Sequence, residues 1–452
     1  MPQDDDYPTR APTSLTQQSS LLMSAFNPSR EFMSWVYQLN GRLDVGALAR
    51  AIDDVVSAHE MLRARFEPGD GSPVQVVTPF RPGVLQMVDL GDRPKAIGLE
   101  AAVRSVEAEY RDLSPWDDAR LRATLYLIHP KTNVLSVFVA EALVDGESGT
   151  LVAAEISRAY AKYAGKSAPD LAVPTGASYL RYALDHPVPP ATQDRAATYW
   201  AALRQEPTEA GRWPTAIGPT SRTRYFKIPV DQWDALVVAV PALGTMPFVV
   251  MLSWLQMALA RVAGAERFVV GSAVSNRSRP GAREMIGSFV GPMRLRAEVH
   301  ADDRLEDVSP RVMTALRQAM AASPVPVPLA EARAVAPGPF EPPPPVVSFF
   351  MFTEREGLDL PGVRQRRFRV HSARDVLRVN CTPDEEGGRN FFFLSASASA
   401  DELTELSTTF RGLLEAAAVS AEPPSSEPPA AEPPVAEPPP SEPPATEAAA
   451  AP

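Results

Sequence analysis

Two stretches of the chain carry the hydrophobic spacing of helices that bury one face. In residues 45–58, apolar side chains recur every three or four positions, at Val45, Leu48, Ala49, Ile52, Val55 and Val56. The same spacing recurs in residues 401–414, at Leu403, Leu406, Phe410 and Leu413. Because an α-helix turns once in about 3.6 residues, these positions share one face. The pattern therefore predicts two amphipathic helices.

Short runs rich in valine, leucine and phenylalanine predict strands between helices. In the first half, the predicted strands are 122–129 and 134–140, with a hairpin turn at 131–133 and a helix near 150–160 opened by residues 146–149. In the second half, the pattern predicts helices at 246–263 and 307–321 and strands at 267–272, 293–299, 346–352 and 390–397. Both halves are therefore predicted to be mixed α/β sandwiches.

Length and proline content divide the chain into four parts. Its 452 residues exceed the size of about 250–300 residues at which a single core usually stops growing. A proline-rich, polar region at 184–194 separates two halves, so we expect subdomains at 12–183 and 184–420. The acidic, polar residues 1–11 are expected to be disordered.

The last part, residues 421–452, is a Pro/Glu-rich tail. Glutamate recurs every five residues, each followed by two prolines, at Glu422, Glu427, Glu432, Glu437 and Glu442. Proline fixes φ and supplies no amide hydrogen, so neither helix nor sheet propagates. We expect a disordered, extended, polyproline-like rod. Its role stays open between a solubilising linker and a docking tail for a larger assembly.

Charge and cysteine content exclude several partners. The formal net charge is −11, whereas a sequence-blind nucleic-acid binder needs clustered lysine and arginine, so no nucleic-acid partner is expected. One short basic stretch, residues 364–369, is interpreted either as a solvated strand edge or as a patch that meets an acidic partner. The single cysteine, Cys381, rules out an internal disulfide and fits a reducing compartment.

The longest apolar stretch, 246–260, predicts a buried helix rather than a membrane span. Ser253 and Gln256 interrupt it and Arg261 closes it, so it falls short of about 20 clean apolar residues. The N-terminus lacks the positive charge and apolar run of a secretory signal. We therefore expect a soluble, cytoplasmic protein with no membrane partner.

The sequence also lacks the motifs of three common classes of site. It contains no Gly-x-Ser-x-Gly elbow of a serine hydrolase and no phosphate-binding Gly-x-x-x-x-Gly-Lys-Ser/Thr loop. Zinc sites need clustered cysteine and histidine, and one cysteine with five scattered histidines does not provide them.

A series of short segments does resemble the motifs of one family. In chain order they are residues 14–18 (SLTQQ), 39–44 (LNGRLD), 59–66 (HEMLRARF), 264–271 (GAERFVVG) with Asn276 and Arg277, and 286–290 (IGSFV). The third segment lacks the family's leading arginine. Their order and spacing over residues 12–416 resemble the condensation domains of nonribosomal peptide synthetases, members of the chloramphenicol-acetyltransferase-like acyltransferase superfamily.

The resemblance implies a fold and a reaction. The fold would be two chloramphenicol-acetyltransferase-like subdomains in a V with a central tunnel. Thioesters linked by phosphopantetheine to acyl or peptidyl carrier proteins would enter it. An acyl group would then pass from the donor thioester to an amine or hydroxyl acceptor. The domain would hold no metal or organic cofactor, and we expect a free-standing monomer that meets its carrier proteins in trans.

The active-site segment departs from the family. The signature His-His-x-x-x-Asp-Gly aligns with residues 140–146, Ala-Glu-Ala-Leu-Val-Asp-Gly, so the spacing survives and both histidines are gone. In the family the second histidine positions or deprotonates the acceptor, a role that suits imidazole because its pKa lies near working pH. Glu141 occupies that position.

Three hypotheses follow for Glu141. It replaces the imidazole as base or hydrogen-bond acceptor, since burial raises the pKa of a carboxyl above its ordinary value of about 4.3. Alternatively, catalysis comes from holding two thioester arms close together, without a base. In the third hypothesis the site is inactive and the fold recruits a carrier protein or a tailoring enzyme, as a degenerate branch of the family does. The first two hypotheses together favour an acyltransferase.

Other residues carry expectations from the same resemblance. Asp145 would pair with Arg277 and tie the active-site loop to the second half, a structural role because an unpaired buried charge is costly. Gly146 would occupy a turn of positive φ, and Ser148 would cap the next helix. Near the tunnel, Ala140 replaces the first histidine and Gly291 replaces an asparagine that lines the tunnel in relatives. Phe350 lies in an unusually phenylalanine-rich strand and would join the core, narrow the tunnel or bind an apolar acyl chain.

Overall fold

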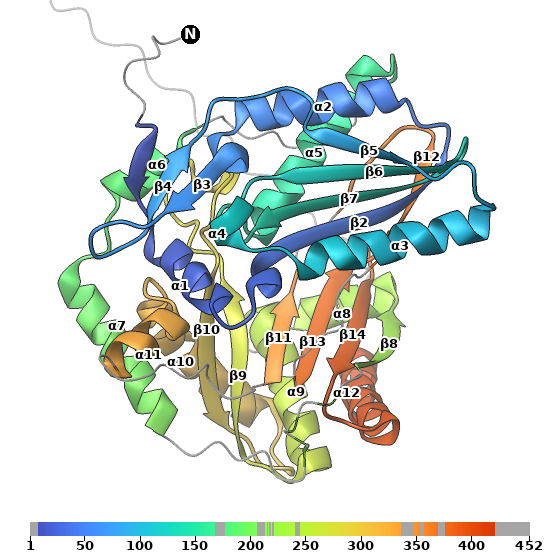
Figure 1. Ribbon diagram of the computed structural model, residues 1–452. Coiled ribbons are helices and arrows are strands. Elements are labelled where there is room, and N and C mark those ends of the chain that lie inside the picture. The colour runs from blue at the N-terminus through green and yellow to red at the C-terminus, as the bar shows by residue number, and fades with distance from the viewer. Residues whose placement is uncertain are drawn as a thin grey trace, which may run out of the picture.

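The computed structural model describes residues 8–167, 177–205, 213–214, 216, 218, 221–239, 245–335, 347–352, 357–368 and 376–420. They form two lobes, one above the other in Figure 1, each with its own sheet and hydrophobic core. The disorder predicted for residues 1–7 and 421–452 concerns residues outside this description. Residues 10 and 11, also predicted to be disordered, form part of a strand, because they pair with residues 75 and 76.

The first lobe holds a three-stranded sheet, β1 (Arg10–Pro12), β4 (Val74–Val77) and β3 (Ala64–Glu67), and a larger sheet. The strands of the larger sheet are β12 (Val363–Phe368), β2 (Phe32–Gly41), β7 (Thr132–Ala140), β6 (Arg122–His129) and β5 (Leu85–Asp89). Its helices are α1 (Leu15–Ser24), η1 (Pro28–Glu31), α2 (Val45–Ala58), η2 (Glu60–Arg63), α3 (Lys95–Arg111), α4 (Pro115–Asp118) and α5 (Gly146–Tyr163).

The second lobe holds a sheet in the order β10 (Gly291–Glu298), β9 (Arg267–Val274), β11 (Val347–Met351), β13 (Leu377–Pro383), β14 (Arg389–Ser395) and β8 (Arg222–Ile228). Its helices are α8 (Val230–Ala239), α9 (Pro247–Ala263), η4 (Ala282–Glu284), α10 (Leu305–Ala322), α11 (Val327–Val335) and α12 (Ala400–Ser420). Helices α6 (Tyr179–Asp185) and α7 (Pro190–Gln205) lie between the lobes in the chain.

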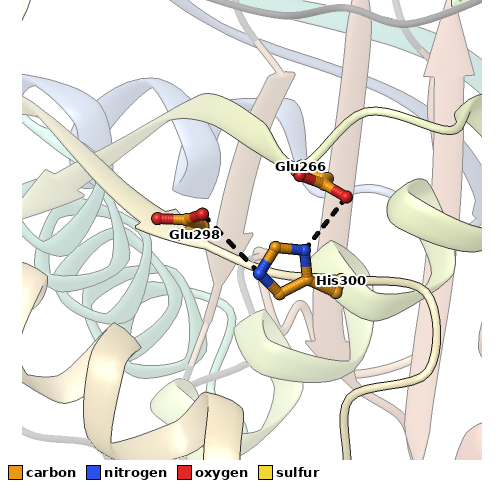
Figure 2. A group of neighbouring side chains, drawn as sticks. All are labelled: Glu266, Glu298 and His300. Atoms are coloured by element: carbon orange, nitrogen blue, oxygen red, sulfur yellow. Dashed lines mark ion pairs between the residues drawn. The ribbon is translucent and has the colours of Figure 1, made fainter.

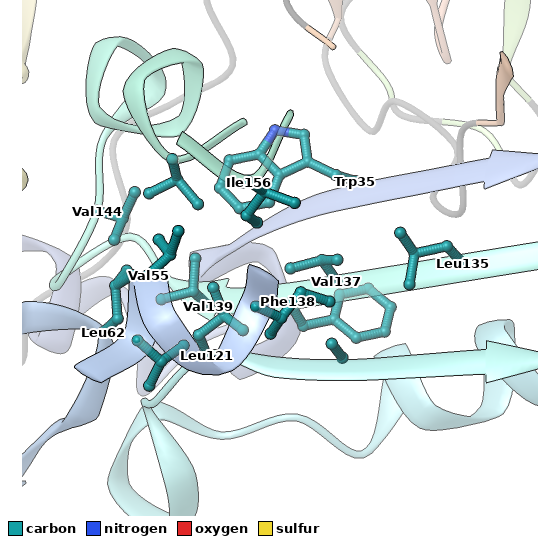
Figure 3. Close-up of a cluster of buried hydrophobic side chains, with 14 of the residues drawn as sticks. Trp35, Val55, Leu62, Leu121, Leu135, Val137, Phe138, Val139, Val144 and Ile156 are labelled. Carbon is teal, nitrogen blue, oxygen red and sulfur yellow. The ribbon is translucent and has the colours of Figure 1, made fainter. Parts of the chain in front are cut away.

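Strand β7 is the centre of the first lobe. Every residue from Thr132 to Ala140 is buried, because α3 covers one side of the sheet while α2 and α5 pack together on the other (Figure 1). Figure 3 shows apolar side chains of this core, among them Trp35 of β2 and Phe138 of β7. A Cβ on Gly149 of α5 would overlap the ring of Trp35, so the absence of a side chain there lets the helix approach the sheet closely.

The second core forms around α9. Residues 249–260 of this helix are all buried, which explains the apolar stretch that resembles a membrane span in the sequence. Helices α10 and α12 pack against α9. Among the described residues, no helix has both the length and the hydropathy needed to cross a membrane.

The second half of the chain contributes two segments to the first lobe. Strand β12, from the second half of the chain, pairs antiparallel with β2 and extends the first sheet (Figure 1). It contains residues 364–368 of the basic stretch, and its arginines are exposed on the sheet edge. After β9, the chain carries Ala282, Ile286 and Phe289 into the first core. A sequence division into 12–183 and 184–420 does not capture these two crossings.

Most predicted elements are confirmed, with small differences at their ends. The helix predicted at 45–58 is α2, whose N-cap Asp44 accepts a hydrogen bond from the amide of Ala47 at 2.9 Å. The hairpin turn between β6 and β7 lies at residues 130–131 rather than 131–133, because Thr132 and Asn133 already pair with β2. The helix after the active-site segment begins at Gly146, earlier than predicted.

Candidate active site

The segment after β7 turns sharply and enters α5. The amides of Leu143 and Val144 both donate to the carbonyl of Ala140, at 2.8 and 3.1 Å. Asp145 then caps α5, because its Oδ1 accepts from the amide of Ser148 at 2.7 Å. The turn and cap bring Asp145 and Glu141 to the side of the first lobe that meets the second lobe.

Arg277 of the loop after β9 forms the ion pair with Asp145. Its Nη2 donates to Oδ1 and Oδ2 of Asp145 at 2.8 and 3.0 Å, and both side chains are almost fully buried. The amides of Phe289 and Val290 donate to the same carboxylate at 3.0 and 3.1 Å. The guanidinium also lies 4.1 Å from the centre of the Phe289 ring. This network ties the active-site turn to the second half of the chain, and we call it the seam.

Ser148 and Gly146 have other roles than those predicted. Ser148 does not cap α5, because Asp145 does; its buried hydroxyl donates to the carbonyl of Gly287 at 2.8 Å and accepts from the amide of Gly287 at 3.0 Å. Ser148 therefore belongs to the seam. Gly146 is the first residue of α5 and is not among the glycines of positive φ.

Asn276, beside Arg277, is the non-glycine residue of positive φ in the described chain, at 54°. Its side chain stabilises this backbone by donating to the carbonyl of Phe289 at 3.1 Å and accepting from Ser323 at 3.1 Å. A Cβ on Gly291 would lie 3.2 Å from Nδ2 of Asn276. Gly291 is thus buried against Asn276. Ala140 is likewise fully buried, in the first core rather than toward the second lobe.

Glu141 lies where the two lobes meet. Its amide donates to the carbonyl of Glu31 at 2.8 Å, and its side chain is only partly exposed. Burial raises the pKa of its carboxyl to about 7, and repulsion from Asp145 adds to this rise. The positive charges of Arg378 in β13 and Arg30 in η1 lower the pKa and offset part of it. Arg378 belongs to the second lobe, so both lobes contribute charges that act on the Glu141 carboxyl.

The sequence interpretation missed Glu31. The antiparallel register pairs Phe32 with Ala140, so Glu31 and Glu141 are the next opposed residues, just beyond the ends of β2 and β7. Ser20 of α1 donates to Oε2 of Glu31 at 2.7 Å. Burial and repulsion from Glu141 raise the pKa of Glu31 to about 8. Only the pairing of strands 100 residues apart in the chain reveals this neighbour, and no local pattern encodes it.

Phe350 and Arg378 approach the site from the second lobe. In β11, Phe349 is fully buried in the second core, so Phe350 points to the opposite face of the sheet and is partly exposed. The guanidinium of Arg378 lies 5.3 Å from the centre of the Phe350 ring. The structure thus assigns Phe350 to the sheet face that also carries Arg378, rather than to the core.

Three of the histidines are engaged elsewhere. His59, at the end of α2, binds Glu155 with Nε2 2.5 Å from Oε2, and Nδ1 of His186 lies 2.9 Å from the carbonyl of Tyr182. Figure 2 shows His300 between Glu266 and Glu298, with a different ring nitrogen toward each carboxylate, at 3.0 and 3.6 Å. This exposed group suits a protonated imidazole, whose pKa Glu266 raises, better than a metal ion held by one nitrogen and both carboxylates.

A pocket of about 300 Å³ lies apart from Glu141. Its lining comes from the first lobe alone and includes Arg63, Arg81, Arg120 and Arg122. It is therefore not a passage between the lobes.

The two lobes and the seam between them define a chloramphenicol-acetyltransferase-like fold, as the sequence resemblance implied. The chain belongs to the condensation domain family, whose model matches residues 9–331. This family serves nonribosomal peptide biosynthesis, and its members work with substrates bound to carrier proteins in assembly lines.

The curated relatives are much longer than this chain. Cyclosporin synthetase simA of Tolypocladium inflatum is 28% identical over 331 residues, which are 71% of this chain and 2% of that protein. Isonitrile lipopeptide synthase of Mycobacterium tuberculosis is 31% identical over 290 residues, which are 60% of this chain and 11% of that protein. The chain thus matches a small part of each relative.

Solved structures share the fold over nearly the whole chain. The first condensation domain of the calcium-dependent antibiotic synthetase, in complex with a substrate analogue, has a TM-score of 0.69 and 21% identity, covering 92% of this chain and 98% of that one. The X-domain from teicoplanin biosynthesis has a TM-score of 0.69 and 23% identity, covering 91% and 96%.

Proposed function

We propose that this chain is an acyltransferase that moves an acyl group from a carrier-bound thioester to an amine or hydroxyl acceptor, with Glu141 as the proton acceptor. The observation that supports it is the partly buried carboxyl of Glu141, which occupies the position of the family's second histidine and is attracted by Arg378 of the second lobe. Its pKa of about 7 makes it a base of the strength that an imidazole has.

The proposed step conserves atoms and charge. The acceptor amine attacks the thioester carbonyl carbon and forms the C–N bond, while its proton passes to the Glu141 carboxylate. The C–S bond then breaks, and the leaving thiolate takes that proton to become the free thiol. The phosphopantetheine-linked thioester is a substrate brought by the carrier protein, and the seam keeps the turn that carries Glu141 in one conformation.

A direct test mixes the protein with an acyl-loaded carrier and candidate acceptors and follows acyl transfer by intact-protein mass spectrometry. Glu141→Gln keeps the size of the side chain and removes the base, so we expect transfer to slow by about 100-fold or more. Glu107→Gln, the same change at an exposed position of α3, is the matched control and should leave the rate unchanged. Transfer that persists in Glu141→Gln would support catalysis by proximity alone and contradict the proposed role of Glu141.

A second candidate function is the recruitment of a partner protein without catalysis. The loss of both histidines, at Ala140 and Glu141, favours it. One similar solved structure is a complex of the teicoplanin X-domain with OxyB, with a TM-score of 0.67 and 22% identity. Carrier binding without transfer, for every acceptor tried, would support this function over the first.

A further inference from the structure

Glu31 and Glu141 are held opposite each other by backbone pairing. Their strands are antiparallel with Phe32 opposite Ala140, and the hydrogen bond from the Glu141 amide to the Glu31 carbonyl extends the pairing by one residue at 2.8 Å. Directly opposed residues of an antiparallel pair have Cβ atoms about 4.5–5.5 Å apart and side chains on the same face, and Glu31 and Glu141 lie one residue beyond the ends of β2 and β7. Two carboxyl groups therefore share one small region where the lobes meet.

Four elements, α1, η1, β13 and α3, contribute polar or charged groups near this carboxyl pair. Ser20 of α1 donates to Glu31 at 2.7 Å. Arg30 of η1 attracts both carboxylates, and Arg378 of β13 attracts Glu141. Tyr110 of α3 is buried beside the pair, and the charge of Glu141 helps to raise the pKa of its phenol to about 12.

These neighbours do not neutralise both carboxylates. Arg30 is exposed to solvent, which screens its charge, and Asp145 adds repulsion to Glu141 from the seam side. Removing two like charges from water at this separation is costly, so one of the two groups keeps its proton. Burial raises the pKa values of both carboxyls, and repulsion from Glu141 adds to the rise in the pKa of Glu31.

We propose that Glu31 and Glu141 act as a pair that shares one proton, with Glu31 as the positioning residue that controls the charge on Glu141. The proposal rests on the proposed function and deepens it, because it names the neighbour with which Glu141 shares its proton. In the resting state the pair carries one negative charge. It becomes neutral when it takes the acceptor's proton, and it returns to one negative charge when the leaving thiolate removes that proton.

The test measures the titration of Glu141 directly, in the whole protein labelled with ¹³C at glutamate carboxyls and without any carrier or acceptor. Glu141→Gln assigns the Glu141 signal by its loss. In Glu31→Gln the repulsion is gone, so we expect the midpoint of Glu141 to fall by about one pH unit or more. A midpoint that stays where it is in the unaltered protein would refute the pairing.

Ser20→Ala is a second, gentler variant. The Ser20 hydrogen bond lowers the pKa of Glu31, so its removal raises that pKa and keeps Glu31 protonated over a wider pH range. Glu141 then meets less negative charge, and its midpoint should fall, in the same direction as in Glu31→Gln. A rise in the midpoint of Glu141 would count against the shared proton.

The acyl-transfer assay separates this inference from the proposed function. If both hold, the acidic limb of the pH–rate profile shifts to lower pH in Glu31→Gln by the amount seen in the titration, while Glu107→Gln leaves it in place. Coupled titration without any transfer would disprove the proposed function and leave the pair intact. If transfer depends on Glu141 but the titration of Glu141 does not change in Glu31→Gln, the proposed function stands and the carboxyl pair is refuted.

Discussion

The seam and the carboxyl pair lie at two ends of one short turn, residues 141–145. They differ in how well their surroundings stabilise a charged carboxylate. In the seam, the Asp145 carboxylate receives two hydrogen bonds from Arg277 and three from backbone amides. In the carboxyl pair, burial raises the pKa values of Glu31 and Glu141 well above 4.5, and repulsion from Glu141 adds to the rise for Glu31. A buried carboxylate that receives many hydrogen bonds stays charged and holds the turn in one conformation. A buried carboxylate that receives few exchanges protons near neutral pH.

Because of this difference, we expect removal of a charged side chain to have opposite effects in the two regions. Removing a partner from the seam leaves a buried charge unpaired, which destabilises the fold. Removing a carboxylate from the pair relieves repulsion, which changes protonation and leaves the fold in place or stabilises it. Three further experiments test the contrast.

Arg277→Ala should have the largest effect on stability. It leaves Asp145 buried without its cation, and breaking a buried ion pair in this way costs about 3–5 kcal/mol. We expect a lower Tm and a lower urea midpoint, measured by circular dichroism. Arg283→Ala, an exposed arginine of the same loop, is the matched control and should change neither. An unchanged Tm in Arg277→Ala would show that the seam does not stabilise the turn.

The carboxyl pair should make stability depend on pH. A carboxyl whose pKa is raised on folding stabilises the folded state while it is protonated. This contribution is complete below about 4.5 and is lost as the pH rises through about 7 and about 8. We therefore expect the Tm to fall over this range.

The double variant Glu31→Gln/Glu141→Gln should flatten this fall, because neither position then titrates. Glu107→Gln should keep it, since its exposed carboxyl lies outside the site. The same pH slope in the double variant and in the unaltered protein would assign the dependence to other groups, and the contrast between seam and pair would lose its electrostatic basis.

The two regions also differ in how far the sequence predicts them. Asp145 and Arg277 are recognisable because they fall in motifs with characteristic spacing, and α2 and β6 follow from local hydrophobic patterns that match their observed bounds. Capping is harder to predict: Ser148 has the chemistry of an N-cap, but the packing of Gly287 against α5 engages its hydroxyl instead. Glu31 was not predicted because it meets Glu141 only through the register of β2 and β7.

The crossings between the lobes show the same limit. The basic residues of β12 suggest an exposed strand, and the strand is exposed. Its pairing with β2, more than 300 residues earlier in the chain, depends on the fold as a whole. The sequence therefore predicts elements and motif residues well, and it predicts poorly the contacts that only long-range strand pairing creates.

Arg378→Met should have the smallest effect, and it tests whether the second lobe acts on the pair. The positive charge of Arg378 lowers the pKa of Glu141, so its removal should raise the midpoint of Glu141, opposite to the shift in Glu31→Gln. Arg378→Lys keeps the charge and should keep most of the effect, which separates electrostatics from the contact with Phe350. The readout is the ¹³C titration of the Glu141 carboxyl. Arg378 lies in β13, which belongs to the second sheet. A shift in Arg378→Met that Arg378→Lys does not show would therefore mean that both lobes set the proton affinity of the Glu141 carboxyl. An equal midpoint in all three proteins would confine control of Glu141 to the first lobe.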